Sequence, residues 1–382
     1  MILGLFEMRR PELRVGYDQA QRLFRTAPTR AVVGLAIATS FAAVAVLGNR
    51  GLIIGLGLGV GIIGALGLQV LIGFTGQISL GHATFLGVGF YTAVALSPGT
   101  YQSVDRVLGS LPAPLSWAIG NAAGWPLVGG LLAAGAVSAL LGLLIGPTAL
   151  RLKGLYLALV TLGLVFLGQH VFINWRSLTG GPQGRSFTAP AIGDFSFATP
   201  SEFAGITVQP LQKQYLLVVV VTLLALWVTS NLRRSRTGRA FQAIHDRDVA
   251  AEVIGVPVAR YKLIAFGLSS FMTGVAGALY GMAINYAVPE FWDIHLSIKF
   301  IAMIIIGGGG VLGALLGATF VELLPIAIRD WIGFEVPLMT TFQFQSLLYG
   351  VAIMVFLVFE PKGLSGIWSN IRRYWRTWPF SY

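Results

Sequence analysis

The chain has 382 residues, of which 55% are hydrophobic and only 11% are charged, and its formal net charge is +11. This composition lies well outside that of soluble globular proteins and indicates a polytopic membrane protein. The absence of cysteine excludes a disulfide framework and cysteine-based metal or redox chemistry, and the four histidines show no paired spacing that would indicate a metal site.

The first thirty residues form a basic segment. They carry six arginines among Leu, Val and Phe, and they are too long and too polar for an ordinary cleaved signal peptide. We expect residues 1–30 to lie along the cytoplasmic membrane surface, with the arginines among anionic headgroups.

Apolar stretches recur from residue 31 to residue 360, as expected of helices that cross a hydrocarbon core about 30 Å thick. We expect an all-α transmembrane helical bundle of about ten spans over 31–360, followed by a basic, aromatic cytoplasmic tail at 361–382. The predicted spans are 31–48, 51–73, 78–97, 126–149, 154–174, 215–232, 261–285, 297–308, 310–328 and 345–360.

The basic residues predict the orientation of these spans. With the N-terminus in the cytoplasm, 19 of the 26 Lys and Arg residues fall in cytoplasmic segments, as the bias of basic residues toward that side requires. Both termini are therefore predicted to be cytoplasmic. The positive charge is then an orientation signal and does not indicate nucleic-acid binding.

The stretch "GFTGQISLGH" at 73–82 places polar groups where two apolar spans meet. Glycine permits a broken or tightly turned helix, and irregular backbone at membrane depth is tolerated only where protein or a water-filled cavity satisfies it. The polar side chains are candidates to line a translocation pathway, whereas the glycines are expected to pack helices closely. The alternative for His82 is a hydrogen-bonded residue between helices. The candidate pathway residues are Thr75, Gln77, Ser79 and His82.

Residues 175–214 form the longest loop on the predicted outer side. Charged side chains in such a loop are candidates for docking a soluble partner by charge complementarity. The alternative is that they are ordinary surface charges. The candidates are Arg176, Arg185, Asp194 and Glu202.

The longest internal cytoplasmic loop, 233–262, contains the charged stretch "GRAFQAIHDRDVAAEVIG" at 238–255. Its small and apolar residues recur at three- and four-residue steps, which predicts a helix or a helical pair with one small-residue face. Gly255, followed by Pro257, fits a helix C-terminal stop. The surrounding charges favour a knob that docks into a cytoplasmic partner, and the alternative is a solvated connector.

Glu322 is the one acidic residue predicted well inside a span. Ionisable groups at membrane depth are costly and usually face a cavity or a partner. Glu322 is therefore a further pathway candidate, and the alternative is an interfacial or subunit-contact residue. The glycines of Gly307–Gly310 lie at the predicted cytoplasmic end of two spans, and the small residues after them predict a face on which another helix can lie close.

Four ordered stretches together resemble the branched-chain amino-acid permeases of ABC importers. They are "GFTGQISLGHATFLGVGFYTA" at 73–93, "RLKGLYLALVTLGLVF" at 151–166 followed by "NWRSLTGGPQG" at 174–184, "SRTGRAFQAIHDRDVAAEVIGVPVARYKLIAF" at 235–266 and "GGGGVLGALLGATFVELLP" at 307–325. The resemblance implies that the stretch 238–255 is the coupling segment that seats in an ATPase subunit. Its implied coupling residues are Gly238, Arg239, Ala243, Asp246, Ala250, Ala251, Glu252 and Gly255.

The resemblance also implies partners and a location. These are a second related permease chain or a second copy, two cytoplasmic ATPase subunits that bind ATP and Mg²⁺, a periplasmic substrate-binding protein, and the lipid of the bacterial inner membrane. This chain is then expected to bind no cofactor and to be a transport subunit rather than an enzyme. It also contains no Gly-x-x-x-x-Gly-Lys-[Ser/Thr] motif that would hold nucleotide phosphates.

Two other function classes stay open at this point. A secondary transporter driven by an ion gradient needs intramembrane ionisable groups, for which Glu322 and His82 are the main candidates. A membrane scaffold would leave the polar glycine-rich breaks unexplained. The resemblance favours branched-chain or related amino acids as substrates, with urea, amides and aromatic or carboxylate compounds as alternatives.

Overall fold

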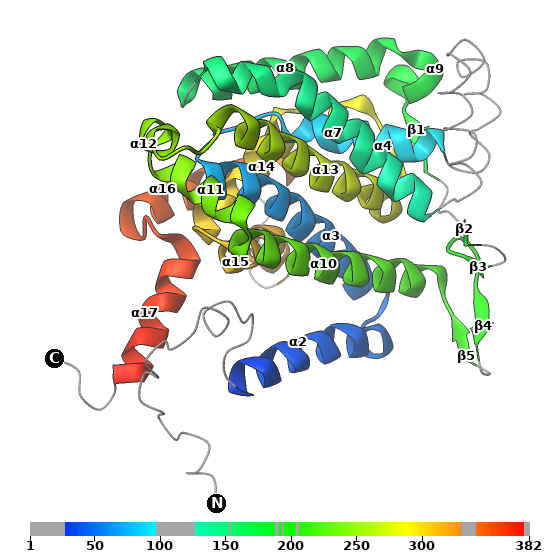
Figure 1. Ribbon diagram of the computed structural model, residues 1–382. Helices are drawn as coiled ribbons and strands as arrows, with labels where there is room; N and C mark the ends of the chain where they lie inside the picture. Colours follow the sequence, from blue (N-terminus) through cyan, green and yellow to red (C-terminus); the bar gives the residue numbers. More distant parts are fainter. Residues whose placement is uncertain are drawn as a thin grey trace, which may run out of the picture.

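The computed structural model describes residues 27–96, 127–152, 154–187, 191–192, 195–203, 206–328, 330 and 341–377. Each of the ten predicted spans coincides with one helix, with ends shifted by a few residues (Figure 1). The helices are α2 (Ala27–Val46), α3 (Asn49–Leu68), α4 (His82–Ala95), α7 (Val128–Arg151), α8 (Leu155–Asn174), α10 (Pro210–Arg234), α13 (Val258–Ile284), α14 (Ile294–Gly307), α15 (Val311–Ala327) and α16 (Thr341–Phe359). Of the basic segment predicted at 1–30, only the last residues are described, and they begin α2.

Within the part of the chain that the structure describes, five helices are long and apolar enough to cross a bilayer on their own: α3 with its π-helical end η2 (Gln69–Gly73), α7, α8, α10 and α13. A sixth span is possible by length if α16 and the following helix α17 (Gly363–Thr377), which meet at a bend of 44°, are counted together. By contrast, α4 and α14 have 14 residues each, about 21 Å at 1.5 Å per residue, which is shorter than the hydrocarbon core. The chain is therefore a multi-pass helical membrane protein, and the count of ten spans stays a prediction.

One end of the bundle, here called the far end, collects segments that were predicted to share the outer side. Arg50, at the start of α3, forms an ion pair with Asp330 beyond α15, with 2.6 Å between Nη2 and Oδ2. The strand β1 (Arg185–Ser186) pairs antiparallel with β6 (Tyr286–Ala287), which follows α13. Segments distant in sequence but predicted on one side thus lie together.

The opposite end, here called the coupling end, carries α11 (Arg236–Asp246) and α12 (Asp248–Val253) (Figure 1). A Cβ atom on Gly310 would lie 2.9 Å from Nη1 of Arg233, at the end of α10, and Gly308 lies against the carbonyl of Lys362 between α16 and α17. The glycine run therefore sits at the same end as the 233–262 loop, as predicted. Which end faces the cytoplasm stays a prediction.

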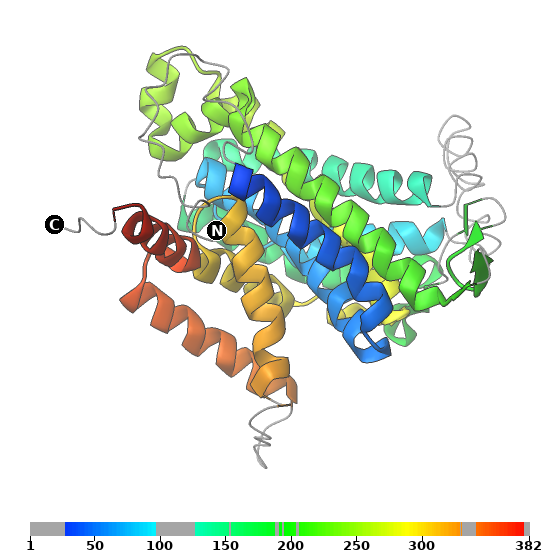
Figure 2. The same ribbon diagram turned by 90° about the horizontal axis from the view of Figure 1, so that it is seen from below.

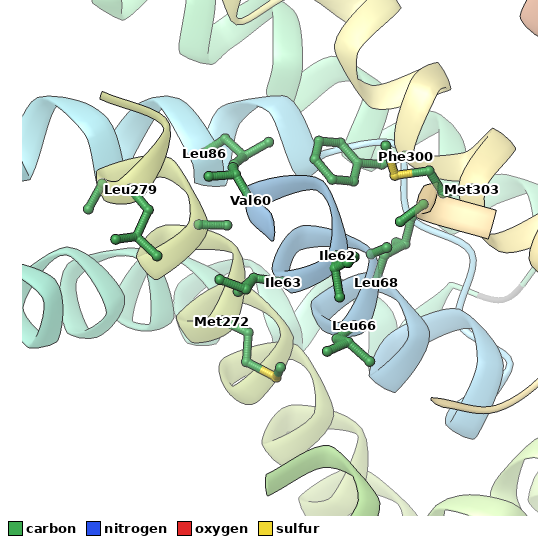
Figure 3. Packing of buried hydrophobic residues seen from close by; sticks show 14 of the residues in the cluster. Val60, Ile62, Ile63, Leu66, Leu68, Leu86, Met272, Leu279, Phe300 and Met303 are labelled. Carbon is green, nitrogen blue, oxygen red and sulfur yellow. The ribbon is translucent and has the colours of Figure 1, made fainter. Parts of the chain in front are cut away.

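Helix α3 runs through the centre of the bundle and is apolar on nearly every side. Its residues 59–71 are buried without interruption. Figure 3 shows its side chains among Leu86 of α4, Leu279 of α13 and Phe300 of α14. Such close contact between neighbouring helices is what stabilises membrane bundles, because lipid tails are as apolar as the side chains themselves.

Helices α4 and α13 approach each other through glycine. A Cβ atom on Gly89 would lie 2.1 Å from the carbonyl oxygen of Gly274, which is backbone and cannot move aside. Only glycine at position 89 allows this separation. The packing role predicted for small residues therefore extends to α13, which the glycine-rich motifs did not single out.

The long 175–214 loop is the main departure from the all-α prediction. It contains the short helices α9 (Arg176–Thr179) and η3 (Gly181–Gln183), and the two hairpins β2 (Ala191–Ile192) with β3 (Phe195–Ser196) and β4 (Ser201–Phe203) with β5 (Ile206–Val208). These strands have two or three residues each and form no larger sheet in the described part of the chain. The reason is the glycine- and proline-punctuated sequence, which offers hairpin turns instead of a helical repeat.

Candidate functional site

The predicted coupling segment is a helical pair. Ser235 caps α11 by accepting a hydrogen bond from the backbone N–H of Gly238 at 3.1 Å, a contact that satisfies an otherwise unpaired donor of the first turn. Gly238 sits so close to the end of α10 that a Cβ atom would lie 2.1 Å from the carbonyl oxygen of Leu232. The glycine is therefore what allows the chain to turn from α10 into α11.

Two contacts hold this pair against α13. The ring of Phe241, which is fully buried, meets Tyr261 edge to face with centroids 6.2 Å apart. The Lys262 ammonium contacts the Asp248 carboxylate at 2.6 Å, and the lysine side chain is only 6% exposed. Both α11 and α12 are thus fixed to the membrane helix α13. A movement of the coupling pair is therefore transmitted to α13.

The outer surface of the pair is apolar as well as charged. Val249, Val253 and Ile254 are 69%, 82% and 73% exposed. We call these three residues the coupling patch. Exposed branched side chains grouped on one short helix indicate a surface that a protein partner covers.

The structure divides the coupling residues predicted from the sequence. Ala251 is 1% exposed and Gly238 is buried, so these two residues face the protein's own body, and Ala243 is half-buried. The single small-residue face predicted for this segment is wrong, because the chain bends at Arg247 and the two helices turn different faces inward. The predicted residues that remain exposed are Arg239, Asp246, Ala250, Glu252 and Gly255.

The polar side chains of the stretch 74–82 are buried, although Gly76 and Ile78 within it are exposed. Thr75, Gln77, Ser79 and His82 are between 0% and 5% exposed. They come together at the break between α3 and α4, beyond the π-helical turn η2. In this conformation they line no open surface of the chain, and their pathway role stays a prediction.

Hydrogen bonds inside this stretch explain how its irregular backbone is tolerated. Thr75 Oγ1 donates to the Leu71 carbonyl at 2.7 Å and accepts from Gln77 Nε2 at 2.8 Å. Thr161 of α8 accepts from the backbone N–H of Leu80 at 2.8 Å. These contacts supply partners that a regular helix would otherwise provide.

His82 begins α4 and ties it to α13. Its Nε2 lies 2.9 Å from Thr273 Oγ1, whereas its Nδ1 is buried and has no partner among the described residues. Gln69, in the π-helical turn, is also fully buried, and neither its Oε1 nor its Nε2 has a partner in the described chain. Unsatisfied polar atoms at the break between two membrane helices are costly and typical of a functional segment.

The polar stretch and the coupling pair touch. Gly76 has a positive φ of 69°, which favours glycine, and a Cβ atom there would lie 3.1 Å from Nδ1 of His245 on α11. The coupling pair therefore contacts two parts of the membrane bundle: α13 through its anchors, and the α3–α4 break through His245.

Glu322 has a partner that the sequence analysis missed. Lys299 on α14 places its Nζ 2.8 Å from Oε1 of Glu322 on α15, and the two side chains are 20% and 18% exposed. Gly61 of α3 closes the site from another side, because a Cβ atom there would lie 2.8 Å from the same oxygen. The carboxylate is therefore neutralised by an ion pair within the bundle.

The outer-loop candidates are spread over the far end. Arg176 and Glu202 are exposed, and Arg185 is half-buried, with its Nη2 donating to the Ser177 carbonyl at 2.7 Å. Asp194 lies outside the described residues. Arg176 and Arg185 meet at one turn of the loop, because Gly181 approaches Arg176 and Gly180 approaches Arg185, whereas Glu202 lies on the hairpin strand β4.

Lys213 is a further residue of this loop that sequence reasoning missed. Its ammonium is buried and donates to the carbonyls of Ser196 and Thr199, at 2.9 and 2.7 Å. It thereby fastens the hairpin region to the first turn of α10. The sequence around Lys213 does not indicate this role, because its partners are backbone carbonyls, which every residue carries.

Comparisons with known proteins agree with this architecture. The family model described as "Branched-chain amino acid transport system / permease component" matches residues 52–358. The permease protein LivM of the high-affinity branched-chain amino acid transport system is 29% identical over 317 residues, both in Salmonella typhimurium and in Escherichia coli K12, covering 79% of this chain and 67% of the relative. The autoinducer 2 import system permease protein LsrC of an Enterobacter species is 29% identical over 230 residues, covering 57% of this chain and 62% of the relative.

No solved structure matches the chain. The family model nevertheless covers four fifths of the sequence, from the second predicted span to the tenth. It includes the polar break, the coupling pair and the Lys299–Glu322 ion pair. The chain therefore belongs to the family of permease components of branched-chain amino acid transport systems.

Proposed function

We propose that this chain is the membrane-spanning permease subunit of an ATP-driven importer, and that the coupling patch is where a cytoplasmic ATPase subunit docks. The observation that carries the proposal is the exposure of Val249, Val253 and Ile254 on a helical pair that is itself firmly anchored. Figure 2 shows the yellow-green pair extending past the end of α10. At that position the patch is better placed to meet a protein than the lipid-facing sides of the bundle are.

The anchors indicate how nucleotide-driven movement would reach the membrane. A rigid-body shift of α11 and α12 would pull on α13 through the Lys262–Asp248 ion pair. It would also press on the α3–α4 break through the contact of His245 with Gly76. Rigid-body movement of one element against another is a common route to alternating access, and the buried polar groups of 74–82 would be uncovered by it.

The proposed substrates are branched-chain or related amino acids. The support is the family and the printed role of the LivM relatives, whereas LsrC is named for autoinducer 2 import. A periplasmic binding protein would deliver the substrate at the far end, a second permease chain would complete the pathway, and the assembly would lie in the bacterial inner membrane. Two ATPase subunits, with bound ATP and Mg²⁺, would supply the energy.

The ion pair argues against transport driven by an ion gradient. A carboxylate that couples transport to a cation must exchange that cation, and the Glu322 carboxylate is already paired with Lys299 at 2.8 Å. Among the described residues, no group of three or more His, Cys, Asp or Glu side chains gathers to hold a metal ion. We therefore assign the energy source to the partner ATPase.

Co-purification tests the docking proposal. We would compare Val253→Asp with Val46→Asp, because these two valines are 82% and 84% exposed and Val46 ends α2 near the far end. Loss of a central apolar contact costs about 2 kcal/mol, roughly a thirtyfold weaker complex. The account predicts that wild type and Val46→Asp retain ATPase subunits and that Val253→Asp loses them. Retention by Val253→Asp, or a chain that transports solute with an ion gradient alone, would contradict the proposal.

A further inference from the structure

Helix α17 forms a surface that neither the family nor the proposed transport mechanism explains. The family model ends at residue 358, and α17 covers Gly363–Thr377. Its first residues are fixed to the body: the backbone of Gly363 lies against Ile306 and Gly307, and Leu364 packs on the core. The helix then runs away from the bundle (Figure 1).

The exposed side of α17 is apolar along one stripe. Trp368, Ile371 and Tyr374 are 54%, 46% and 56% exposed, and Ile367 is 38% exposed. At 3.6 residues per turn these positions fall within one third of the helix circumference, in line with Leu364. The stripe therefore continues a surface that is half-buried at Leu364 and more exposed farther along the helix.

The polar side of α17 is basic. Its sequence, "GLSGIWSNIRRYWRT", contains three arginines, and no acidic residue occurs from 363 to the end of the chain. Arg372 and Ser369 are exposed. A helix with a wide apolar stripe, aromatic residues and an arginine-rich polar face is typical of helices that lie in the membrane interface.

The position of the helix fits that environment. It turns from α16 by 44° and begins beside Gly308, at the coupling end of the bundle. Figure 1 shows it at a steep angle to α10, and Figure 2 shows it at the same end of the molecule as the coupling pair but separate from it. It therefore extends sideways, toward the surrounding lipid headgroups, instead of continuing along the spans.

We propose that α17 is an interfacial anchor that binds anionic phospholipid. In this arrangement Trp368, Ile371 and Tyr374 enter the boundary between headgroups and acyl chains, where aromatic side chains are enriched. Arg372, on the polar side, contacts anionic headgroups, to which basic residues near the membrane surface are attracted. A protein partner would need acidic groups placed opposite the arginines of α17. An anionic membrane surface carries negative charge throughout and needs no dedicated site.

Spin labelling of the full-length chain tests the proposal, and the absence of native cysteine makes it straightforward. Ile371→Cys places a nitroxide on the apolar stripe. Ser369→Cys is the matched control, two residues away and so about 160° round the helix. Both proteins are reconstituted in vesicles of phosphatidylcholine with phosphatidylglycerol, and collision rates with oxygen and with a water-soluble nickel chelate are measured.

A lipid anchor predicts several-fold more oxygen than nickel collisions at position 371 and the reverse preference at position 369. The preference at 371 should weaken in vesicles of phosphatidylcholine alone. Equal nickel access at both positions would place α17 in water and overturn the proposal. Loss of both kinds of collision at 371 would show a protein covering the stripe, and equal insertion in neutral and anionic vesicles would overturn the anionic preference.

Discussion

The coupling pair and the polar groups within the membrane bundle invert the usual distribution of side chains. At the coupling pair, branched apolar residues such as Val253 are exposed, although the segment is rich in charged residues. Within the bundle, His82 and Gln69 are buried among apolar helices. Each inversion costs free energy in the isolated chain, so each marks a place where function rather than folding stability determines the residue.

The two regions should respond differently to substitution. Removing the partner of a buried polar group should lower the stability of the isolated protein, because the group keeps its desolvation cost and loses the contact that offsets it. Changes to the coupling patch should leave the isolated protein stable and act only when a partner is present. The variants below test this contrast, from the largest expected effect on stability to the smallest.

Removal of one member of the buried ion pair should be the most damaging change. Lys299→Met leaves the Glu322 carboxylate unpaired within the bundle, and breaking such a pair costs about 3–5 kcal/mol. Unfolding of the purified protein in detergent measures the loss. The double variant Lys299→Met with Glu322→Gln should recover most of the stability. A single variant as stable as wild type would mean that the carboxylate finds water or another partner.

Thr273→Val should have an intermediate effect. It removes the hydroxyl beside His82 Nε2 and leaves a buried imidazole without that partner, at a cost of about 1–3 kcal/mol. Thr319→Val is the matched control, because Thr319 is only half-buried and its hydroxyl bonds to Leu315 within its own helix. An equal loss of stability in the two variants would show that the contact with His82 contributes no more to stability than a hydrogen bond within one helix.

Arg50→Ala should change stability by less than about 1 kcal/mol. The Arg50 and Asp330 side chains form an ion pair at 2.6 Å but are 64% and 29% exposed, and exposed pairs contribute little and are screened by salt. Comparing the stability lost in Arg50→Ala with that lost in Lys299→Met isolates the effect of burial, since both variants remove one basic partner of a carboxylate. A loss as large as that of Lys299→Met would overturn the claim that burial sets the cost.

Val249→Ser should leave stability within about 0.5 kcal/mol, as surface substitutions generally do. Its effect should appear only in the assembled transporter, as a several-fold loss of substrate-stimulated ATP hydrolysis. Leu144→Ser, which changes a 76% exposed residue on the side of α7, provides the control in the membrane region. A change in stability without a change in coupled hydrolysis would assign Val249 a structural role instead.

Much of the helical framework followed from the sequence. Apolar length and the placement of Lys and Arg predicted a helix at each of ten positions, and the glycine run at Gly307–Gly310 lies at the same end as the coupling segment, as expected. These features depend on local composition. The helical pair at 238–255 was predicted for the same reason.

The contacts between side chains of different helices could not be predicted from the sequence. Lys299 was not singled out, because nothing in its own span shows that Glu322 faces it from the next helix. The exposure of the coupling patch likewise did not follow, since it depends on which side of α12 packs inward, and Ala251 lies on that side whereas Val253 does not. Such features depend on how elements pack, which a single sequence without an alignment does not encode locally.

Cross-linking from the coupling patch is the most direct test of the docking account. Val253→Cys can be labelled selectively with a photoreactive maleimide in native membranes, because the chain has no cysteine of its own. Val46→Cys, equally exposed near the far end, is the control. The account predicts an adduct between position 253 and a cytoplasmic ATPase subunit, and none from position 46. An adduct from position 253 with lipid alone, or the same adduct from both positions, would contradict it.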